Sequence, residues 1–549
     1  MKRRQILVTN ALPYVNTDLH LGHLVEHVQS NTWVRFQRMR GHDVRAFCGD
    51  DTHGTATMIR AEKEGCEPEA LLEEVRRAHE RDLADFGVEY DLYGSTHSPS
   101  NRRLVNEVWA ALRAGGHVTD REVVQLFDPK AGIFLADRFV KGRCPRCGSP
   151  DQYGDNCEVC GAVYGPEELV DPVSTITGTR PELRSAIHYF VVLEHFHDFL
   201  AEWTQQPGRM PSETANWLAN GFLSEPLRDW DVSRPAPYFG FEIPDAPGHY
   251  FYVWLDAPVG YMSATWDWCE LSGGDFGHWW GNPDCEIHHF IGKDIAYFHT
   301  LFWPAMLRAW DRPLPQRVQV HGFLTVNGEK MSKRKGTFVL ARTYLEHLSP
   351  DYLRYYFASK LSGGASDLDL NFDELVAKVN ADLVGKVVNL ASRTARFIEG
   401  QPLAARYPDD GGLFATGADL GREIADAYEA CDTGKVSRLV MGLADRANEY
   451  VEARAPWTLR KRGDAQEELR DVCTVALNLF HQIVLYLAPI LPRLATEGRA
   501  LFGATAAPTW GEAAVPLGAR EVGKFSALLT RVDPERVAAV FAASTLDQP

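Results

Sequence analysis

Two short segments, far apart in the chain, carry side chains suited to binding a nucleotide. In the first, His20 and His23 flank Gly22, shortly after the apolar run Ile6–Val8. Imidazoles donate hydrogen bonds to phosphate oxygens, and a glycine lets a ligand approach the backbone. A helix that begins here adds unpaired N–H groups and the positive end of its dipole. Taken alone, such a pattern more often belongs to a surface helix with incidental histidines, so the second segment decides the interpretation.

The second segment, residues 328–336, begins and ends with glycine and contains four cations: Lys330, Lys333, Arg334 and Lys335. The whole chain has a formal net charge of −17, so this positive charge is local. A loop of cations bounded by glycines is suited to closing over a triphosphate. Groups positioned to meet charge that develops in a transition state accelerate reactions, by roughly 100- to 1000-fold for one hydrogen-bond donor. Alone, the loop could be a solvated basic turn. Together, the two segments resemble the paired signatures of the class I aminoacyl-tRNA synthetases, and this resemblance implies a catalytic set of His20, His23, Lys330 and Lys333.

A strand, a turn and a helix must position the first segment. Ile6–Val8 is a short β-branched apolar run that fits a buried strand. Asparagine and proline mark a turn over residues 10–16. Thr17 or Asp18 is the expected N-cap of a helix that carries the two histidines in its first turns.

Residues 44–54 look like a second strand with polar residues at its carboxyl end. The apolar part is followed by Gly-Asp-Asp-Thr-His-Gly, and open α/β sheets place ligands at such ends. Paired aspartates followed by His-Gly can bind a metal, an ammonium group or a ribose. An Asx-rich turn that caps a helix explains the same residues equally well.

Two later segments, 250–261 and 288–299, look like the second half of a split nucleotide-binding sheet. The second repeats the design of an apolar strand, a glycine and polar residues. Most of the aromatic residues here are expected to be core. The exceptions are side chains at strand-to-loop exits: Tyr14, Trp254, Tyr261 and His299.

Four of the ten cysteines form two C-x-x-C pairs, Cys144/Cys147 and Cys157/Cys160. Four thiolates at this spacing suit tetrahedral Zn²⁺ with no open position. A redox pair is the alternative, but two pairs this close favour a metal. The ion is expected to be structural, because a small insert has little core of its own. The other six cysteines are scattered and form no disulfide framework.

From about residue 372, Ala- and Leu-rich amphipathic segments predict an α-helical bundle. The expected helices are 374–399, 418–434, 436–454, 467–487 and 492–502, after a helical stretch at 344–361. Four polar side chains at helical spacing are predicted to line one face of the first: Lys386, Asn389, Arg393 and Arg396. Trp457 lies on a later connection, where its indole is suited to stacking on an unpaired base. A solvated helix face would explain the basic strip alone. The remaining 45 or so residues are expected to form a tail that packs on the body.

Length and composition narrow the class of protein. At 549 residues the chain exceeds one compact core, so several domains are expected. The apolar run near the N-terminus is too short for a signal peptide, and the longest one, 483–491, is too short to span a bilayer. We therefore expect a cytoplasmic protein without a membrane segment. The acidic balance argues against indiscriminate nucleic-acid binding but leaves room for a basic face that binds one RNA.

Taken in order, these segments resemble the methionyl-tRNA synthetase family of the class I aminoacyl-tRNA synthetases, in its bacterial type with one pair of zinc knuckles. The resemblance covers essentially the whole chain. It rests on ALPYVNTDLHLGH, CGDDTHGT, the two cysteine pairs, FYVWLDAPVGYM, HFIGKDIAYFH, HGFLTVNGEKMSK, NLASR and APW. In most members the lysine loop reads K-M-S-K-S, and here Arg334 stands where the final serine is usual.

The resemblance implies a Rossmann-type parallel α/β catalytic sheet with a zinc-bearing insert, followed by an all-α bundle that binds the anticodon. The expected divisions are 1–115 and 229–325 for the two catalytic halves, 116–228 for the insert, 326–385 for the lysine loop and linking region, and 386–549 for the helical domain with its tail.

The resemblance also implies three sets of site residues. The family's methionine pocket corresponds to Leu12, Tyr14, Asp51, Trp254, Ala257, Pro258, Tyr261, Ile295 and His299. Its ATP site corresponds to His20, Gly22, His23, Lys293, Asp294, Lys330 and Lys333. Its anticodon readers correspond to Asn389, Arg393 and Trp457.

The implied reaction is the activation of L-methionine with Mg²⁺-ATP, followed by transfer to the 3′ end of tRNA(Met), initiator tRNA included. One Zn²⁺ per chain is expected, and a monomer, since the dimerising domain of some members is not seen. A leucine, isoleucine or valine enzyme would need a much longer insert, and a small nucleotidyltransferase would lack the helical half. A non-catalytic zinc protein that binds RNA is the alternative from another class.

Overall fold

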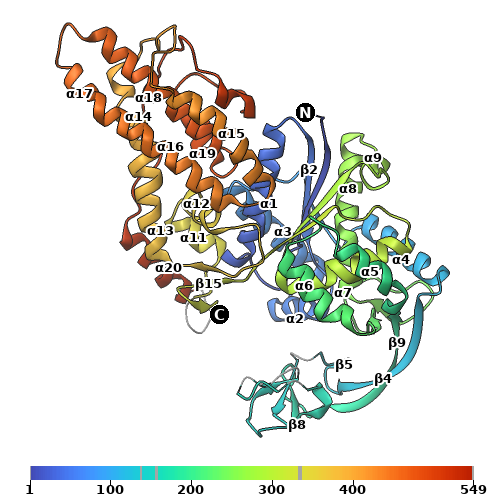
Figure 1. Cartoon of the computed structure of the whole chain (residues 1–549). Helices are drawn as coiled ribbons and strands as arrows, with labels where there is room; N and C mark the ends of the chain where they lie inside the picture. The colour runs from blue at the N-terminus through green and yellow to red at the C-terminus, as the bar shows by residue number, and fades with distance from the viewer. Residues whose placement is uncertain are drawn as a thin grey trace.

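The computed structural model describes residues 2–136, 139–154, 157, 159–162, 164–331 and 337–546. A parallel sheet flanked by helices forms the part of the chain that the sequence predicts to be catalytic, called the catalytic body below (Figure 1). An insert of strands projects from this body on a long ribbon, and a helical bundle lies on the other side. The predicted fold class, an α/β sheet with an insert followed by helices, is confirmed.

Five parallel strands form the central sheet in the order β14-β13-β1-β2-β3. Their bounds are β1 Gln5–Asn10, β2 Asp43–Asp50, β3 Leu92–Ser95, β13 Glu286–Gly292 and β14 Arg317–His321. The order reverses between β1 and β13, because β2 and β3 follow on one side while β13 and β14 lie on the other. Ligands of such sheets bind at this switch point, outside the carboxyl ends of the strands.

Side chains of β1 alternate between two hydrophobic cores, as the pleat of a strand requires. Ile6 and Val8 pack with Trp33 of α1, whereas Leu7 packs with the core of α4 and α8 on the opposite face. Both faces are buried, which explains the continuous apolar run in the sequence. The helices of the catalytic body are α1 Leu21–Met39, α2 Thr55–Glu64, α3 Pro68–Asp85, α4 Pro99–Ala114, α5 His197–Thr204, α6 Ser212–Asn220, α7 Val253–Asp256, α8 Val259–Ser272, α9 Phe276–Trp280 and α10 Trp303–Ala309.

The insert interrupts the chain between α4 and α5. Two long antiparallel strands, β4 Val118–Asp128 and β9 Glu182–Val191, form the ribbon that carries it away from the sheet (Figure 1). The shorter strands are β5 Ile133–Phe134, β6 Val140–Arg143, β7 Gln152–Tyr153, β8 Val170–Ser174 and β10 Trp230–Asp231. A further hairpin pairs β11 Ser233–Pro235 with β12 His249–Phe251.

A small sheet connects the catalytic body to the helical part. Its strands are β15 Leu324–Val326, β16 Glu329–Lys330 and β17 Leu368–Leu370, in the order β16-β15-β17. The β15–β16 hairpin leads into the lysine loop. The predicted helix at 344–361 is two helices, α11 Ala341–His347 and α12 Pro350–Lys360, because Ser349 caps a new helix with a proline at its first position.

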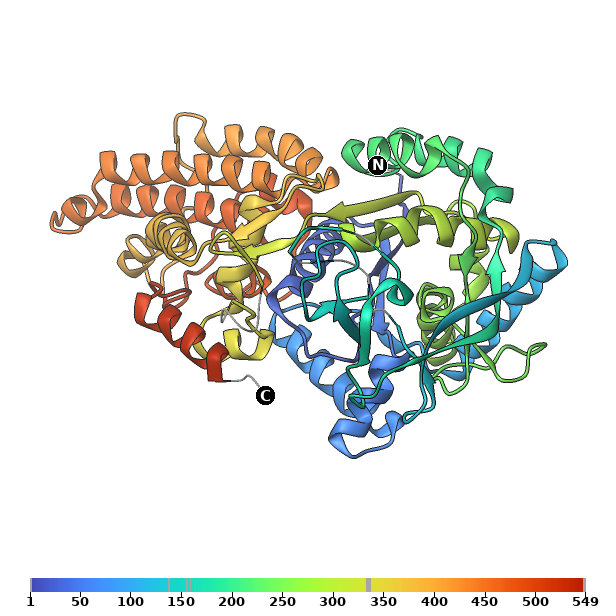
Figure 2. The same ribbon diagram turned by 90° about the horizontal axis from the view of Figure 1, so that it is seen from below.

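The helical part lies to one side of the catalytic body (Figure 2). Its helices are α13 Phe372–Lys378, α14 Asn389–Ser392, α15 Leu413–Glu429, α16 Thr433–Arg454, α17 Pro456–Leu459, α18 Gln466–Leu487, α19 Pro492–Ala500 and α20 Pro534–Leu546. A π-helical segment, Val379–Val388, joins α13 to α14. The prediction of one helix over 374–399 was therefore wrong at its C-terminal end, because α14 ends at Ser392. The tail packs back as expected, with α20 against α11 and α13.

One buried arginine joins the two large parts. The guanidinium of Arg354 on α12 donates to the backbone oxygen of Ile490 at 2.7 Å, to that of Phe86 at 3.2 Å and to Oδ1 of Asn31 at 3.1 Å. These acceptors lie on the connection between α18 and α19, at the C-cap of α3 and within α1. Side chains of α1, α12 and α18 share one hydrophobic core around it.

Among the residues that the structure describes, every helix is too short or too polar to cross a bilayer.

Candidate active site

A cleft of about 1120 Å³ opens at the carboxyl ends of β1 and β13, where the strand order reverses. Most of the predicted methionine and ATP residues line it: Leu12, Tyr14, His20, Gly22, His23, Asp51, Trp254, Ala257, Pro258, Tyr261, Asp294, Ile295, His299 and Lys330. The sheet therefore brings together segments that lie up to three hundred residues apart in the chain.

The first signature begins α1 at the cleft. His20, rather than Thr17 or Asp18, is the N-cap, so the cap prediction was wrong. Nδ1 of His20 accepts the N–H of Gly22 at 3.1 Å, and Nδ1 of His23 accepts the N–H of His20 at 3.3 Å. The two side chains form a reciprocal capping box at the positive end of the helix.

This capping fixes the form of the two imidazoles. Burial lowers the pKa of His20 to about 4 and lowers the pKa of His23 well below its ordinary value, so both rings are neutral. Because each Nδ1 accepts a hydrogen bond, the single ring hydrogen lies on Nε2. The rings stack with their centroids 3.7 Å apart, and the two Nε2 donors are suited to phosphate oxygens.

Asp51, at the end of β2, is buried among acids. Burial raises its pKa well above the ordinary value, and the charges of Asp256 and Asp50 raise it further. Its Oδ1 has no hydrogen-bond partner within the described part of the chain. A buried carboxylate of this kind is stabilised by a cation, because desolvation and like charges both disfavour its ionised form. Asp51 is therefore suited to holding a ligand's ammonium group.

Backbone bonds place Asp51 against the turn that leads to α1. Its N–H donates to the backbone oxygen of Pro13 at 2.9 Å, and its own carbonyl accepts from the N–H of Val15 at 3.1 Å. Tyr14 pairs with Asp51 in an isolated parallel bridge. The amino-acid side and the phosphate side of the cleft are thus built on one connected turn.

A tyrosine–histidine pair lies in the wall of the pocket. The hydroxyl of Tyr261 lies 2.7 Å from Nε2 of His299, and Nδ1 of His299 lies 3.0 Å from the backbone oxygen of Ile295. Burial lowers the pKa of His299 to about 4, so the neutral ring donates from Nδ1 and accepts the tyrosine hydroxyl at Nε2. His299 belongs to a π-helical turn, Phe298–Phe302, a feature often found at functional sites.

Aromatic and apolar groups form the rest of this wall. The indole of Trp254 stacks on Phe298 with centroids 3.9 Å apart and an angle of 2° between the planes. Phe298 and Leu12 also line the cleft. Aromatic rings of this kind contact a thioether sulfur favourably, by roughly 0.3–1.5 kcal/mol for each contact.

The lysine loop reaches the first signature through Met331. A Cβ placed on Gly22 would lie 2.7 Å from Cε of Met331, so this thioether packs against the glycine between the two histidines. Lys330 and Met331 both line the cleft. Lys333 lies outside the described residues.

Lys293 is the one predicted ATP residue, among those described, that does not line the cleft. Its Nζ forms an ion pair with Asp367 and lies 4.4 Å from the centre of the Phe323 ring. The Lys293 ammonium lowers the pKa of Asp367. Asp367 lines the cleft and also accepts the N–H of Phe323 at 2.8 Å, so the pair ties the end of β13 to the small sheet.

Several lining residues were missed in the sequence. Oε2 of Glu26 on α1 lies 3.5 Å from Nε2 of His321, and burial raises the pKa of Glu26 to about 7. Arg234 also lines the cleft. His321 ends a strand and could have been found by that signal. The glutamate sits mid-helix among apolar neighbours, where no local pattern marks it.

The insert also reaches over the cleft. Residues 123–126 of β4, 134–136 and 139 near β5, and Pro166 with Glu167 contribute to its wall. Val124 is 55% exposed, so an apolar surface of the ribbon faces solvent there.

The four paired cysteines form one cluster in the insert, as predicted. Their ligand atoms all lie within 4.8 Å of one another, with Sγ–Sγ distances of 3.8 Å for Cys144–Cys160 and 3.6 Å for Cys147–Cys157. Zn–S bonds of about 2.3 Å place tetrahedral sulfurs about 3.8 Å apart, so the cluster is compatible with zinc.

The described residues of the two knuckles make the same backbone contacts. In each, the glycine after the second cysteine has a positive φ (73° at Gly148 and 71° at Gly161), and its N–H donates to the carbonyl of the first cysteine. The N–H of the second cysteine points at the sulfur of the first, at 3.4 Å in both. These N–H groups favour thiolates.

The three predicted anticodon readers lie together in the bundle, far along the chain from the cleft residues. The guanidinium of Arg393 lies 4.4 Å from the centre of the Trp457 ring and forms a 2.7 Å ion pair with Glu452. Asn389 is one helical turn earlier, in α14. Arg396 is not on this face, because it follows the end of α14 and lies 5.8 Å from the Phe525 ring. The prediction of one continuous basic face was wrong at that residue.

Comparisons with known proteins agree with this geometry. Residues 6–395 match the family described as "tRNA synthetases class I (M)". "Methionine--tRNA ligase 1" of Sorangium cellulosum is 58% identical over 534 residues, which cover 97% of this chain and 77% of that protein. "Methionine--tRNA ligase" of Rhodopirellula baltica is 55% identical over 537 residues, 98% of this chain and 79% of that protein.

The fold has solved counterparts as well. The structure titled "Mycobacterium tuberculosis methionyl-tRNA synthetase in complex with methionyl-adenylate" superposes with a TM-score of 0.80 at 24% identity, over 96% of this chain and 100% of that one. Family match, identity over nearly the whole length and a cleft of this construction agree: the chain belongs to the methionine–tRNA ligase family of class I tRNA synthetases.

Proposed function

We propose that the cleft activates L-methionine with ATP, giving methionyl-adenylate and pyrophosphate, and then transfers the methionyl group to the 3′ end of tRNA(Met), initiator tRNA included. One observation carries the proposal. A single cleft contains a buried carboxylate, Asp51, whose Oδ1 has no hydrogen-bond partner among the described residues, beside an aromatic pocket. The same turn leads to a helix N-terminus with two neutral imidazole donors.

The amino acid binds on the Asp51 side of the cleft. The carboxylate of Asp51 holds the α-ammonium group, which also relieves the repulsion from Asp50 and Asp256. The thioether lies against the aromatic and apolar wall. This wall consists of Leu12, Tyr14, Trp254, Ala257, Pro258, Tyr261, Ile295 and His299.

ATP binds on the α1 side, with Mg²⁺ neutralising phosphate charge. The Nε2 donors of His20 and His23 face phosphate oxygens, and Gly22 lets the chain of phosphates approach the N-terminus of α1. Lys330 adds positive charge from the β15–β16 hairpin. We assign Lys293, Asp294 and, from its motif, Lys333 to the same site.

The chemistry needs no nucleophile from the protein. The carboxylate of methionine attacks the α-phosphorus in line, a P–O bond forms, and the bond to pyrophosphate breaks. His20, His23 and the lysines stabilise the charge that develops on the leaving pyrophosphate. A ribose hydroxyl of the tRNA then attacks the carbonyl carbon of the adenylate, and AMP leaves.

Zinc and tRNA bind elsewhere in the chain. We propose that one Zn²⁺ is held by Cys144, Cys147, Cys157 and Cys160 as a structural ion, because four thiolates leave no open position. Asn389, Arg393 and Trp457 are assigned to the anticodon. A cytoplasmic monomer and the five expected divisions of the chain belong to the proposal, although the helix over 372–392 runs through the division at 385–386.

Amino-acid-dependent exchange of pyrophosphate into ATP tests the proposal. Assayed with each of the twenty amino acids, the protein should catalyse exchange with methionine above all others. Asp51→Asn should raise the KM for methionine roughly 10- to 100-fold, since a hydrogen bond to a charged group contributes about 1.5–3 kcal/mol. The KM for ATP should change less than about threefold.

Asp373→Asn serves as the matched control, because this exposed aspartate lies on α13, away from the cleft. Equal or greater exchange with another amino acid would contradict the proposed substrate. An unchanged KM for methionine in the Asp51→Asn protein would contradict the proposed ammonium site.

A further inference from the structure

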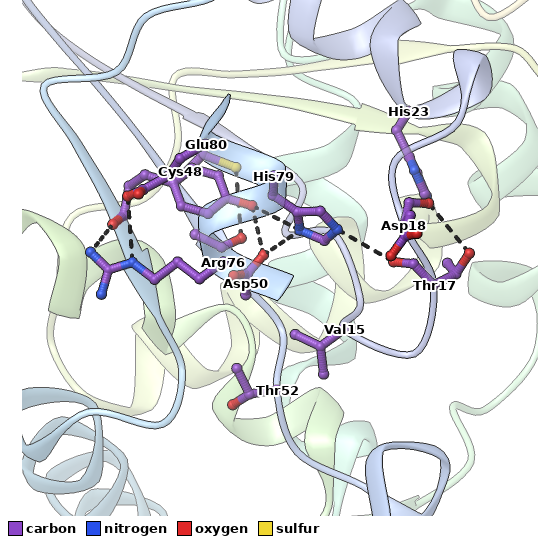
Figure 3. A network of polar contacts seen from close by, with 12 residues as sticks. Val15, Thr17, Asp18, His23, Cys48, Asp50, Thr52, Arg76, His79 and Glu80 are labelled. Carbon is purple, nitrogen blue, oxygen red and sulfur yellow. Dashed lines mark hydrogen bonds and ion pairs between the residues drawn. The ribbon is translucent and has the colours of Figure 1, made fainter. Parts of the chain in front are cut away.

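A buried histidine behind the cleft connects its two sides. His79 lies on α3, and its side chain is fully buried. Nδ1 of His79 lies 2.7 Å from Oδ1 of Asp50, and Nε2 lies 3.3 Å from the backbone oxygen of Thr17. Figure 3 shows the ring between these two groups, with a dashed line to each. His79 itself does not line the cleft.

The two partners of His79 belong to the two segments that are proposed to bind the two substrates. Asp50 ends β2 and directly precedes Asp51, the proposed ligand of the amino-acid ammonium group. Thr17 lies in the turn before α1, three residues ahead of His20. Both partners are hydrogen-bond acceptors, so the ring holds both only when each of its nitrogens carries an N–H, as in the imidazolium form. This one ring then joins the segment that holds the amino acid to the segment that holds the triphosphate.

The other supports of this turn act before Thr17 or on the neighbouring side chain. Arg60 on α2 donates to the backbone oxygen of Val15 at 2.8 Å and to the carboxylate of Asp18 at 3.3 Å. The backbone of Asp51 holds Pro13 and Val15. Among the described residues, His79 is the side chain that holds the backbone oxygen of Thr17.

The anchor at the other end of His79 is itself fixed. The hydroxyl of Tyr93 on β3 donates to the same Oδ1 of Asp50, at 2.7 Å. Asp50 is 1% exposed, so water does not compete for this oxygen. Tyr93, Asp50, His79 and Thr17 form one chain of contacts from the sheet to the turn. Figure 3 shows the last three of them.

We propose that His79 is a positioning residue for the activation step. By holding the Thr17 carbonyl against the end of β2, it sets the separation between the carboxylate of bound methionine and the α-phosphorus of ATP. The proposal rests on the proposed function. In-line attack needs reacting atoms about 3–3.5 Å apart, and a displacement of 1 Å costs roughly 100-fold in rate.

A positioning role predicts a specific kinetic signature. Each substrate keeps its own contacts when His79 is replaced, so its KM should change little while kcat falls. A residue that acts only on stability would lower the melting temperature without changing kcat of the folded protein.

Two amide side chains separate the contacts of His79. The amide nitrogen of asparagine stands as many bonds from Cβ as Nδ1 does, and that of glutamine as many as Nε2. His79→Asn therefore keeps a donor for Asp50 and loses the one for Thr17, whereas His79→Gln keeps a donor that reaches Thr17.

Pyrophosphate exchange with methionine should resolve these variants. We expect kcat to fall roughly 10- to 100-fold in His79→Asn and His79→Ala, with both KM values within about threefold of wild type. His79→Gln should recover kcat to within about threefold. His481→Ala, in a buried histidine of α18, is the control for removing a buried imidazole.

Three results would overturn the proposal: wild-type kcat in His79→Asn, a kcat in His79→Gln as low as in His79→Ala, or KM values that rise while kcat is kept. If His79→Asn and His79→Ala do not fold, judged by circular dichroism and melting, His79→Gln alone decides, and its kcat must stay within threefold. Exchange by the wild-type protein is measured first, so failure of the proposed function is seen separately from failure of this inference.

Discussion

Replacing Gly22 by alanine is expected to remove most of the activation rate and leave the fold intact. The new Cβ would lie 2.7 Å from Cε of Met331, 2.8 Å from Cε1 of His20 and 2.9 Å from Nδ1 of His20. The methyl end of Met331 is flexible and can move away. The imidazole cannot move without losing its bond to the N–H of residue 22, so the phosphate donor on Nε2 is displaced with it.

The energies of this substitution separate stability from rate. Loss of the His20 cap costs about 1 kcal/mol, and the higher helix propensity of alanine offsets up to about 1 kcal/mol. The net change in the free energy of unfolding is therefore within about 1 kcal/mol. A displaced donor to the developing phosphate charge costs about 2.7–4 kcal/mol of transition-state stabilisation, a 100- to 1000-fold loss of kcat.

Methionine-dependent pyrophosphate exchange and thermal melting measure the two effects on the same protein. Gly442→Ala is the matched control, because Gly442 lies inside α16 and nothing lies within 4 Å of its added Cβ. It should be stabilised slightly and keep its full rate. The reasoning is refuted if Gly22→Ala keeps its exchange rate within threefold of wild type while its stability is unchanged.

Three further predictions concern the bundle, the insert and acid stability. Trp457→Ala should raise the KM for tRNA(Met) roughly 10- to 100-fold, the cost of one stacked base, and leave pyrophosphate exchange at the wild-type rate. The control Trp217→Ala, which removes an exposed indole, should keep the wild-type KM for tRNA(Met). Equal KM values in Trp457→Ala and wild type would contradict a role of Trp457 in RNA binding. Native mass spectrometry should find one equivalent of zinc in the wild-type protein and in Cys66→Ser, and none in Cys157→Ser, whose insert should also become sensitive to protease. Full zinc content in Cys157→Ser would contradict the four-thiolate site. Burial lowers the pKa values of His299 and His481 to about 4, so below about pH 6.5 the unfolded chain binds protons at these histidines that the folded chain does not bind. The free energy of unfolding should therefore fall between pH 6.5 and 4, by at most about 1.4 kcal/mol per pH unit for each histidine. Denaturant titrations at pH 7.5 and 5.0 should show a smaller drop for His481→Gln than for wild type, and an equal drop would contradict the assignment.

Local patterns predicted the parts of the cleft that follow strands. A short apolar run followed by polar residues indicates the carboxyl end of a strand. This pattern occurs at β1 with its turn, at β2 before Asp51 and at β13. Parallel strands place all such ends at one edge of the sheet. The topology therefore brings these side chains together even though the sequence says nothing of their distances.

Long-range contacts explain what the sequence did not predict. His20 is the N-cap because the chain pairs there with Leu340, and the N–H of Leu21 donates to the carbonyl of Val339 at 3.0 Å. The usual preference for Thr or Asp at a cap is overridden by this tertiary contact. The approach of Glu26 to His321 and the reach of the insert over the cleft depend in the same way on contacts between remote segments.

Arg354 determines how the molecule can be divided. A fragment ending after β17 would keep this guanidinium but lose the acceptor at Ile490, and the apolar faces of α1 and α12 would lose their cover from α18. In such a fragment the buried guanidinium would lack one of its hydrogen-bond acceptors and an apolar surface would be exposed to water, so we expect it to aggregate. The bundle therefore cannot be removed as a separate unit, because the helix that begins at the cleft and the helices that carry the proposed anticodon face share one hydrophobic core.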